Sequence, residues 1–91
     1  IKPFFIEYIL NLIRSYKANQ ELSAAVSKYN QRILKDNEDL QAYLALGLIN
    51  REYGDKEIAK TYLTRFVRLA PGLRISKQVM DIIRDLEENL K

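Results

Sequence analysis

The sequence repeats its own pattern of apolar and small residues after 34 positions. When the chain is shifted by that interval, residues 6–39 overlay residues 40–73, and a third, incomplete unit begins at residue 74. Apolar residues then face apolar residues, in the pairs Ile9 with Tyr43, Leu12 with Leu46, Ala25 with Ala59, and Tyr29 with Leu63. A period of this length is typical of stacked supersecondary units, each of which buries its apolar side against its neighbours.

The spacing of apolar residues predicts five helices, at about residues 4–18, 20–35, 40–53, 56–69 and 73–90. Pro3 suits a first helical position, and Asp39 and Asp55 are expected N-caps. We expect Gly54 to adopt the left-handed conformation that ends many helices. Because no run of residues alternates as a strand would, we predict an all-α fold with antiparallel neighbours.

Residues 40–73 carry small and turn-forming residues at fixed spacings. They are Tyr43, Leu46, Gly47, Gly54, Asp55, Ala59 and Pro71. Gly47 removes a side chain where the second helix of the unit crosses the first, and Ala59 does the same from the opposite side. With these residues the unit resembles a tetratricopeptide repeat, a 34-residue helix–turn–helix. It departs from the family pattern at Asn50, Leu63 and Phe66.

Residues 6–39 form a degenerate copy of that unit. Ala25 and Tyr29 agree with the repeat, but Ile13 replaces the glycine and Asn37 replaces the proline. Arg32 fills a position that is usually small and buried in the family. Because an isolated charge is costly to bury, we expect Arg32 to extend its charged end to solvent or this copy to pack more loosely.

The resemblance implies one domain over residues 1–91, a right-handed superhelical stack of two helical hairpins plus a C-terminal capping helix. The hairpins are expected at 6–39 and 40–73, and the capping helix at 74–91. The chain opens on Ile1 rather than Met, so we expect it to be a fragment of a longer protein.

The resemblance also implies a binding surface, because the first helix of each repeat lines the concave face in this family. The corresponding positions are Leu10, Arg14, Lys17, Leu44, Leu48, Arg51, Gln78, Ile82 and Asp85. We expect a groove with an apolar floor and a basic end formed by Arg14, Lys17 and Arg51. Such a groove suits an extended or helical peptide that carries acidic residues. The alternative is that these are ordinary exposed positions.

The first predicted helix is apolar around nearly its whole circumference, and a helix of this kind is normally covered on more than one side. We expect Phe4, Phe5 and Tyr8 to pack against upstream repeats or against a second copy of the chain. The alternative is simple burial in the core of the domain.

Composition argues against an enzyme. The chain has no Cys and no His, so the commonest nucleophilic thiol, general base and metal ligands are missing, and we expect no cofactor and no metal. The net charge of +3 is spread along the chain, and we do not expect nucleic-acid binding. The alternative to this expectation is weak nucleic-acid binding through Arg65, Arg68, Arg74 and Lys77. The longest apolar stretch, residues 3–13, is too short for the roughly 20 residues of a membrane span.

The sequence therefore predicts a non-enzymatic protein–protein interaction module or scaffold, part of a larger assembly factor, with a protein or acidic peptide as partner. The first alternative is an oligomerisation module that uses the apolar N-terminal helix, and the second is weak nucleic-acid binding. The compartment is undetermined, with the cytoplasm slightly favoured.

Overall fold

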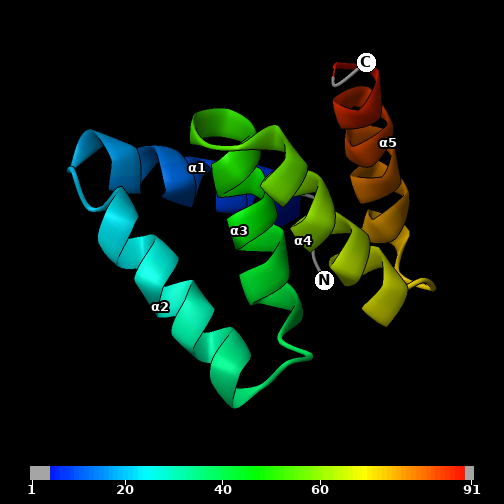
Figure 1. Cartoon of the computed structure of the whole chain (residues 1–91), viewed down its shortest axis with the longest axis horizontal. Coiled ribbons are helices and arrows are strands. Elements are labelled where there is room, and N and C mark those ends of the chain that lie inside the picture. The colour runs from blue at the N-terminus through cyan, green and yellow to red at the C-terminus, as the bar shows by residue number, and fades with distance from the viewer. Residues whose placement is uncertain (1–4, 90–91) are drawn as a thin grey trace.

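The computed structural model describes residues 5–89, and every regular element in that range is an α-helix (Figure 1). The helices are α1 (Phe5–Ala18), α2 (Leu22–Lys35), α3 (Leu40–Tyr53), α4 (Lys56–Leu69) and α5 (Arg74–Asn89). The all-α prediction is confirmed for this part of the chain. The predicted helical positions of Pro3, Phe4 and Leu90 lie outside the described residues.

The 34-residue period reappears in the helix boundaries. Helices α2 and α4 begin at residues 22 and 56, and α3 and α5 begin at residues 40 and 74. Helices α3 and α4 have the predicted bounds, whereas α2 begins two residues later than expected. Gln20 causes this delay, because it adopts a left-handed backbone (φ 60°) and closes the turn between α1 and α2.

Asp39 and Asp55 are the N-caps of α3 and α4. The Asp39 side chain accepts a hydrogen bond from the backbone N–H of Ala42 at 3.1 Å. The Asp55 side chain accepts from Glu57 at 2.8 Å and from Ile58 at 3.2 Å. Both N-caps are confirmed, and each pairs donors that the first helical turn leaves without partners.

Gly54 ends α3 in a different way from the one predicted. Its φ is −137°, so the left-handed conformation was the wrong prediction. Glycine is needed there for space instead, since a Cβ would lie 2.7 Å from Asn50 Oδ1 and 3.2 Å from Asn50 Cα. The Asn50 amide is held in that place by donating to the Leu46 carbonyl at 2.8 Å.

Helices α3 and α4 form a tight antiparallel hairpin, with the most extensive helix–helix contact in the described chain (Figure 1). A Cβ on Gly47 would lie 2.4 Å from Leu63 Cδ2 and 3.5 Å from the Ala59 carbonyl oxygen. The predicted close approach at Gly47 and Ala59 is therefore confirmed, and Ala59 is fully buried there.

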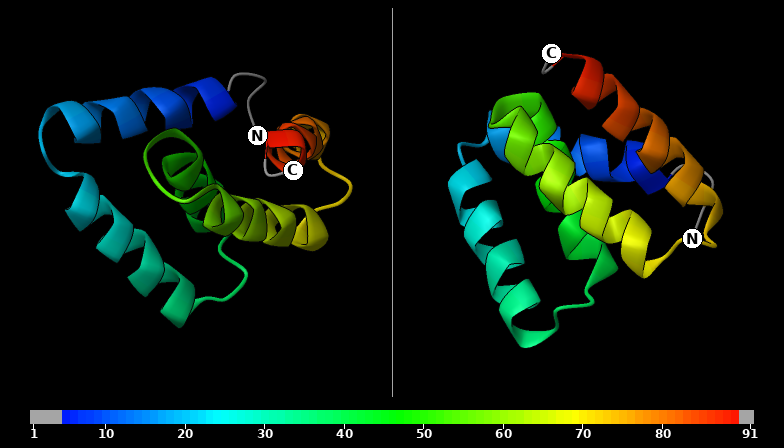
Figure 2. Two further views of the ribbon diagram at one scale, coloured as in Figure 1. Left: turned by 45° about the horizontal axis from the view of Figure 1, so that its top comes forward. Right: turned by 45° about the vertical axis from the view of Figure 1, so that its right-hand side comes forward.

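The first hairpin is open by comparison. Helices α1 and α2 make few contacts with each other, diverge from their connecting turn (Figure 2), and each contacts α3 more than it contacts the other. The position of Gly47 is taken in α1 by Ile13, which lies 34 residues earlier and is buried. A branched side chain does not fit a crossing where even a Cβ would collide, so α1 packs on α3 instead.

The charged end of Arg32 on α2 pairs with a carboxylate rather than extending to solvent, a contact that the sequence did not predict. It is half-buried, and its Nε and Nη2 donate to Asp39 Oδ2 and Oδ1 at 2.9 and 3.0 Å. Nη2 also donates to Gln41 Oε1 at 3.1 Å, and the guanidinium lies 5.5 Å from the centre of the Tyr29 ring. The charge reaches a carboxylate at the start of α3, which ties the open hairpin to the tight one.

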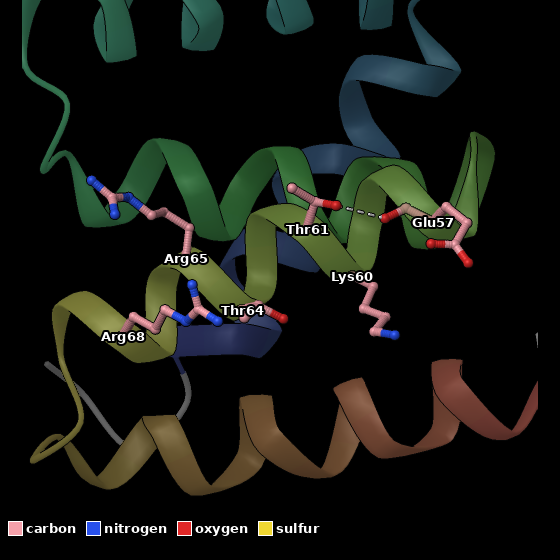
Figure 3. A pocket seen from close by; sticks show the side chains of 6 residues that line it. All are labelled: Glu57, Lys60, Thr61, Thr64, Arg65 and Arg68. Carbon is pink, nitrogen blue, oxygen red and sulfur yellow. Dashed lines mark hydrogen bonds between the residues drawn. The ribbon is translucent and has the colours of Figure 1, made fainter.

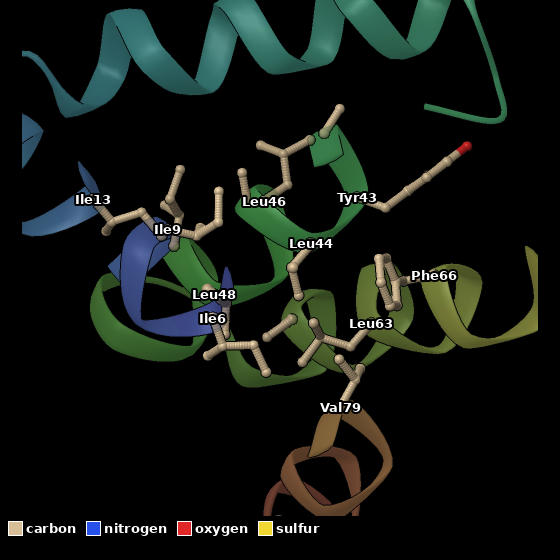
Figure 4. Close-up of a cluster of buried hydrophobic side chains, with 14 of the residues drawn as sticks. Ile6, Ile9, Ile13, Tyr43, Leu44, Leu46, Leu48, Leu63, Phe66 and Val79 are labelled. Atoms are coloured by element: carbon tan, nitrogen blue, oxygen red, sulfur yellow. The ribbon is translucent and has the colours of Figure 1, made fainter. Parts of the chain in front are cut away.

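Helix α3 is the centre of the bundle. Residues 42–49 are all buried, because α1, α2 and α4 contact this helix from different sides. The core is completed by side chains from the neighbouring helices, including Ile6 and Ile9 of α1, Phe66 of α4 and Val79 of α5 (Figure 4).

Helix α5 packs beside α4 (Figure 2). Its start is fixed by Ser76, a buried residue whose hydroxyl donates to the carbonyl of Ala70, the residue that ends α4. The backbone N–H of Ser76 also donates to the Leu73 carbonyl. These bonds set the spacing between the C-terminal end of α4 and the first turn of α5.

Candidate functional site

Two of the three cations predicted at the basic end of the groove share one carboxylate, and the third lies over the aromatic ring of the next residue. Arg51 Nη2 lies 3.1 Å from Glu52 Oε1, and Arg14 Nη2 lies 4.0 Å from the same oxygen. Lys17 Nζ lies 5.4 Å from the centre of the Tyr53 ring. We call Arg14, Lys17 and Arg51, with Glu52 and Tyr53, the basic cluster.

The basic cluster exists because the last turns of α1 and α3 meet. Cations from two helices lie together there, because the negative C-terminal end of each helix dipole favours positive side chains. The basic cluster contains three positive side chains and one carboxylate, so it carries an excess of positive charge. The Arg14 side chain is 55% exposed and that of Arg51 only 27%, so Arg51 is held in place while Arg14 can turn to a partner. Chemically, the cluster suits carboxylate oxygens, which guanidinium groups bind at short range.

The apolar floor predicted for the groove is not exposed. Leu44 and Leu48 are fully buried and Leu10 is 7% exposed, all three within the core. The expectation of an accessible leucine floor is therefore wrong for this arrangement. The leucines are buried because the first hairpin is open and α1 lies against α3. Side chains of α1 therefore share a core with the leucines that a concave face would have exposed (Figure 4).

The α5 positions of the predicted groove lie apart from the basic cluster. Gln78 and Asp85 are exposed, and Ile82 is half-buried against the core. Among residues 5–89, none of the three forms a hydrogen bond or an ion pair with the cations of the cluster. The structure thus brings together the basic end and leaves the rest of the predicted groove dispersed.

An aromatic pair lies at the start of α1. The rings of Phe5 and Tyr8 stack with centroids 6.4 Å apart and planes inclined by 23°. Phe5 is half-buried, whereas Tyr8 is 58% exposed. Phe4, the third residue predicted here, lies outside the described residues.

Helix α4 carries a polar face that the sequence prediction did not assign to a site. A shallow hollow of about 370 Å³ lies along it (Figure 3). Its lining is Glu57, Lys60, Thr61, Thr64, Arg65 and Arg68. Lys60 points toward α5, whereas Arg65 points toward α3 and places its guanidinium 6.0 Å from the Tyr43 ring centre (Figure 3). The recurrence of cations and threonines at helical spacing was the signal in the sequence.

A second hollow adjoins the first between α4 and α5. It has a volume of about 470 Å³ and shares Thr64 and Arg68 with its neighbour. The residues considered for nucleic-acid binding, Arg65, Arg68, Arg74 and Lys77, are exposed around the end of α4 and the start of α5. Only Arg65 and Arg68 line a hollow in the described chain.

Residues 5–89 contain no cluster of three or more acidic side chains placed to hold a metal ion. None of the five helices combines the length and apolar character needed to cross a membrane. Comparison of the chain with protein-family models, curated proteins and solved structures gave no match.

Proposed function

We propose that this chain is a non-enzymatic protein–protein interaction module that binds an acidic segment of another protein at the basic cluster. The observation that carries this proposal is the excess of positive charge in the basic cluster, where Arg14 and Arg51 share Glu52 and Lys17 lies over the Tyr53 ring. A partner carboxylate can take the place of the Glu52 oxygen beside Arg51 and Arg14. Such a replacement pairs the same guanidinium groups without burying a lone charge.

We infer that the chain is a tetratricopeptide-like stack. In it α3 and α4 are the regular hairpin, α1 and α2 an opened copy, and α5 the capping helix. The Gly47–Leu63 approach and the 34-residue spacing of the helix starts support this assignment. A stack of this kind presents surface rather than a reaction centre, which agrees with a binding role in a larger assembly.

The binding surface differs from the groove that the family resemblance implies. With Leu44 and Leu48 in the core, the partner rests on the charged ends of α1 and α3 instead of an apolar floor. Affinity from such a surface is sensitive to salt, because exposed charges are screened at physiological ionic strength.

The test uses a fluorescein-labelled oligoglutamate peptide as probe and fluorescence anisotropy as readout. We expect the double variant Arg14→Glu, Arg51→Glu to abolish binding. The matched control is Lys28→Glu, Lys35→Glu, which makes the same change of charge on exposed positions of α2. Equal affinity of both variants for the probe would show that binding follows net charge and not the basic cluster, and would refute the proposal.

The exposed Tyr8 favours a second candidate, self-association through the start of α1. A ring that is 58% exposed yet stacked on Phe5 is a pre-formed apolar contact surface. An isologous dimer would bring this pair against the same pair of a second copy.

A further inference from the structure

Helix α2 buries fewer residues than any other helix within residues 5–89. Of its 14 residues, Ala25 and Tyr29 alone are buried, whereas α3 buries eight. Leu34, near the end of α2, is 86% exposed. The helix makes few contacts with α1, and α4 reaches it at Asn30, whose exposed side chain accepts a hydrogen bond from the Tyr62 hydroxyl. Because packing supplies most of the stability of a helix in a folded chain, α2 is held weakly.

The N-terminal end of α2 also lacks a cap. Glu21 precedes the helix, and its side chain makes no capping hydrogen bond, unlike the side chains of Asp39 and Asp55. The first turn of α2 contains no acidic residue that could interact with the helix dipole. Gln20, in the turn before the helix, has a left-handed backbone that disfavours most residues other than glycine. Neither capping nor the dipole therefore stabilises the start of α2, and the turn before it is strained.

One ion pair near the other end of α2 offsets these weaknesses. Arg32 donates to both carboxylate oxygens of Asp39 and to Gln41 Oε1. The side chain of Asp39 is only 16% exposed, whereas the side chains of the Arg84–Asp81 pair are 68% and 71% exposed. Hydrogen bonds between charged groups contribute more to stability when water is partly excluded than at an open surface. The Arg32–Asp39 pair is therefore a strong polar contact between α2 and α3.

Helix α3 does not need α2 for its own first turn. Asp39 Oδ1 accepts a hydrogen bond from the backbone N–H of Ala42, and this bond lies within the start of α3. The Tyr43 hydroxyl donates to the Asn37 carbonyl at 2.9 Å, so the connection between α2 and α3 is fixed to α3. Helix α4 contacts α3 extensively on its own account. Removal of α2 from α3 therefore leaves the cap of α3 and the tight hairpin intact.

The surface that α2 covers is apolar. Leu46 of α3 points toward α2 and is 1% exposed (Figure 4). Ala25 and Tyr29 are buried on the α2 side of the same contact. Separation of the two helices would bring these side chains into contact with water, which is unfavourable. An open state is therefore a minor population, whose size depends on the bonds that keep α2 closed.

We propose that α2 opens as a unit while α3 and α4 stay packed, and that the Arg32–Asp39 pair limits this opening. The open state has a lower free energy than the unfolded chain, because the tight hairpin keeps its contacts. Opening exposes Leu46 on a surface that a helix has just left, so a ligand that contacts Leu46 can bind only the open state. The device is separate from the basic cluster, since no residue of that cluster lies on α2.

The test uses introduced cysteines, because the sequence contains none. Ala25→Cys reports on α2 and Ala59→Cys reports on α4. The two alanines lie 34 residues apart at corresponding positions and are 3% and 0% exposed. Labelling of each thiol by the aromatic disulfide DTNB follows the population of the state that exposes it, when reclosing is faster than labelling. We expect the Ala25→Cys variant to be labelled at least about a hundredfold faster than the Ala59→Cys variant.

Two further substitutions separate opening of α2 from unfolding of the whole chain. Arg32→Gln should accelerate the labelling of Ala25→Cys by about tenfold, whereas Arg84→Gln, which removes an exposed ion pair, should leave its rate unchanged. Leu63→Ala removes a fully buried side chain from the tight hairpin. It should accelerate the labelling of Ala59→Cys by at least about tenfold and leave that of Ala25→Cys unchanged, because the open state retains the hairpin.

Equal labelling rates at the two positions would overturn the proposal, because α2 would then open only with the whole chain. Acceleration of both positions by Leu63→Ala would lead to the same conclusion. An unchanged rate for Ala25→Cys after Arg32→Gln would refute the role given to the Arg32–Asp39 pair. Far-UV circular dichroism of each variant before labelling verifies that the thiols are measured in folded protein.

Discussion

Gly47 on α3 faces Leu63 on α4 so closely that a Cβ on the glycine would lie 2.4 Å from Leu63 Cδ2 and 2.6 Å from its Cγ. Leu63 is fully buried, so its side chain has no free space into which it can move. This single contact sets the distance between the two helices of the tight hairpin, and through them the position of α5.

The Gly47–Leu63 contact predicts that Gly47→Ala destabilises the protein. Alanine gains about 1 kcal/mol of helix propensity over glycine, but overpacking a core costs about 1–3 kcal/mol, so the net effect is a loss. Gly72→Ala is the matched control, because a Cβ there would meet nothing within 4 Å. Urea denaturation should show a lower midpoint for the first variant and an equal or higher one for the second. Adding Leu63→Ala should remove most of the penalty of Gly47→Ala, and strict additivity would contradict the steric explanation.

The sequence predicted the second helical hairpin better than the first. The bounds of α3 and α4 and their N-caps depend on local residues such as Asp39 and Asp55, and these predictions agreed with the structure. The tight hairpin was also predictable, because Gly47 and Ala59 leave a specific space. The opening of the first hairpin was not predicted, although Ile13 at the glycine position was visible, because a mismatch indicates that a contact is lost but not what replaces it.

The candidate site was harder to predict for a related reason. Arg14 and Arg51 lie near the C-terminal ends of α1 and α3, and these ends meet even though the first hairpin is open, so the two cations still share Glu52. The exposure of Leu44 and Leu48 depended on the orientation of α1, a long-range property, and it was predicted wrongly. The two hollows beside α4 were not predicted, because the residues that line them look in sequence like an ordinary solvated helix face.

Asp39 is predicted to stabilise the chain in two ways, as the N-cap of α3 and as the partner of Arg32. Asp39→Ala should cost about 2 kcal/mol, since a lost cap costs about 1 and the loss of a partly buried charged pair adds to it. Asp39→Asn should cost less than Asp39→Ala, because the asparagine amide oxygen can still cap the helix, although the charge and one of the two oxygens that accept from Arg32 are lost. Asp55→Ala is the control for capping alone. Equal losses for Asp39→Ala and Asp55→Ala in urea titrations would show that the Arg32 pair contributes nothing.

The Phe5–Tyr8 pair is predicted to support self-association. Sedimentation equilibrium at rising protein concentration should reveal a dimer for the wild-type chain and a weaker one for Tyr8→Ser, because the substitution removes an exposed aromatic contact. Tyr53→Ser is a suitable control, since Tyr53 is also an exposed aromatic but lies in the last turn of α3. A monomer at all concentrations would remove self-association as a function of this surface.

Tyr29 is predicted to make stability fall at high pH. Burial raises the pKa of Tyr29 above its ordinary value of 10.0, the nearby Tyr16 adds to that rise, and the Arg32 guanidinium partly opposes it. Below about pH 10 the phenol is neutral in both states, so its contribution to stability is fully present. Above that pH the unfolded chain releases the proton while the folded chain retains it, and the free energy of unfolding falls by at most about 1.4 kcal/mol per pH unit until the folded pKa is passed.

The difference between wild type and Tyr29→Phe isolates this effect, because phenylalanine keeps the ring and cannot titrate. Urea midpoints measured between about pH 9 and pH 11 should fall more steeply for the wild type than for the variant. Parallel pH profiles would mean that the Tyr29 hydroxyl stays solvated in the folded chain, and the open hairpin would then have to admit water beside it.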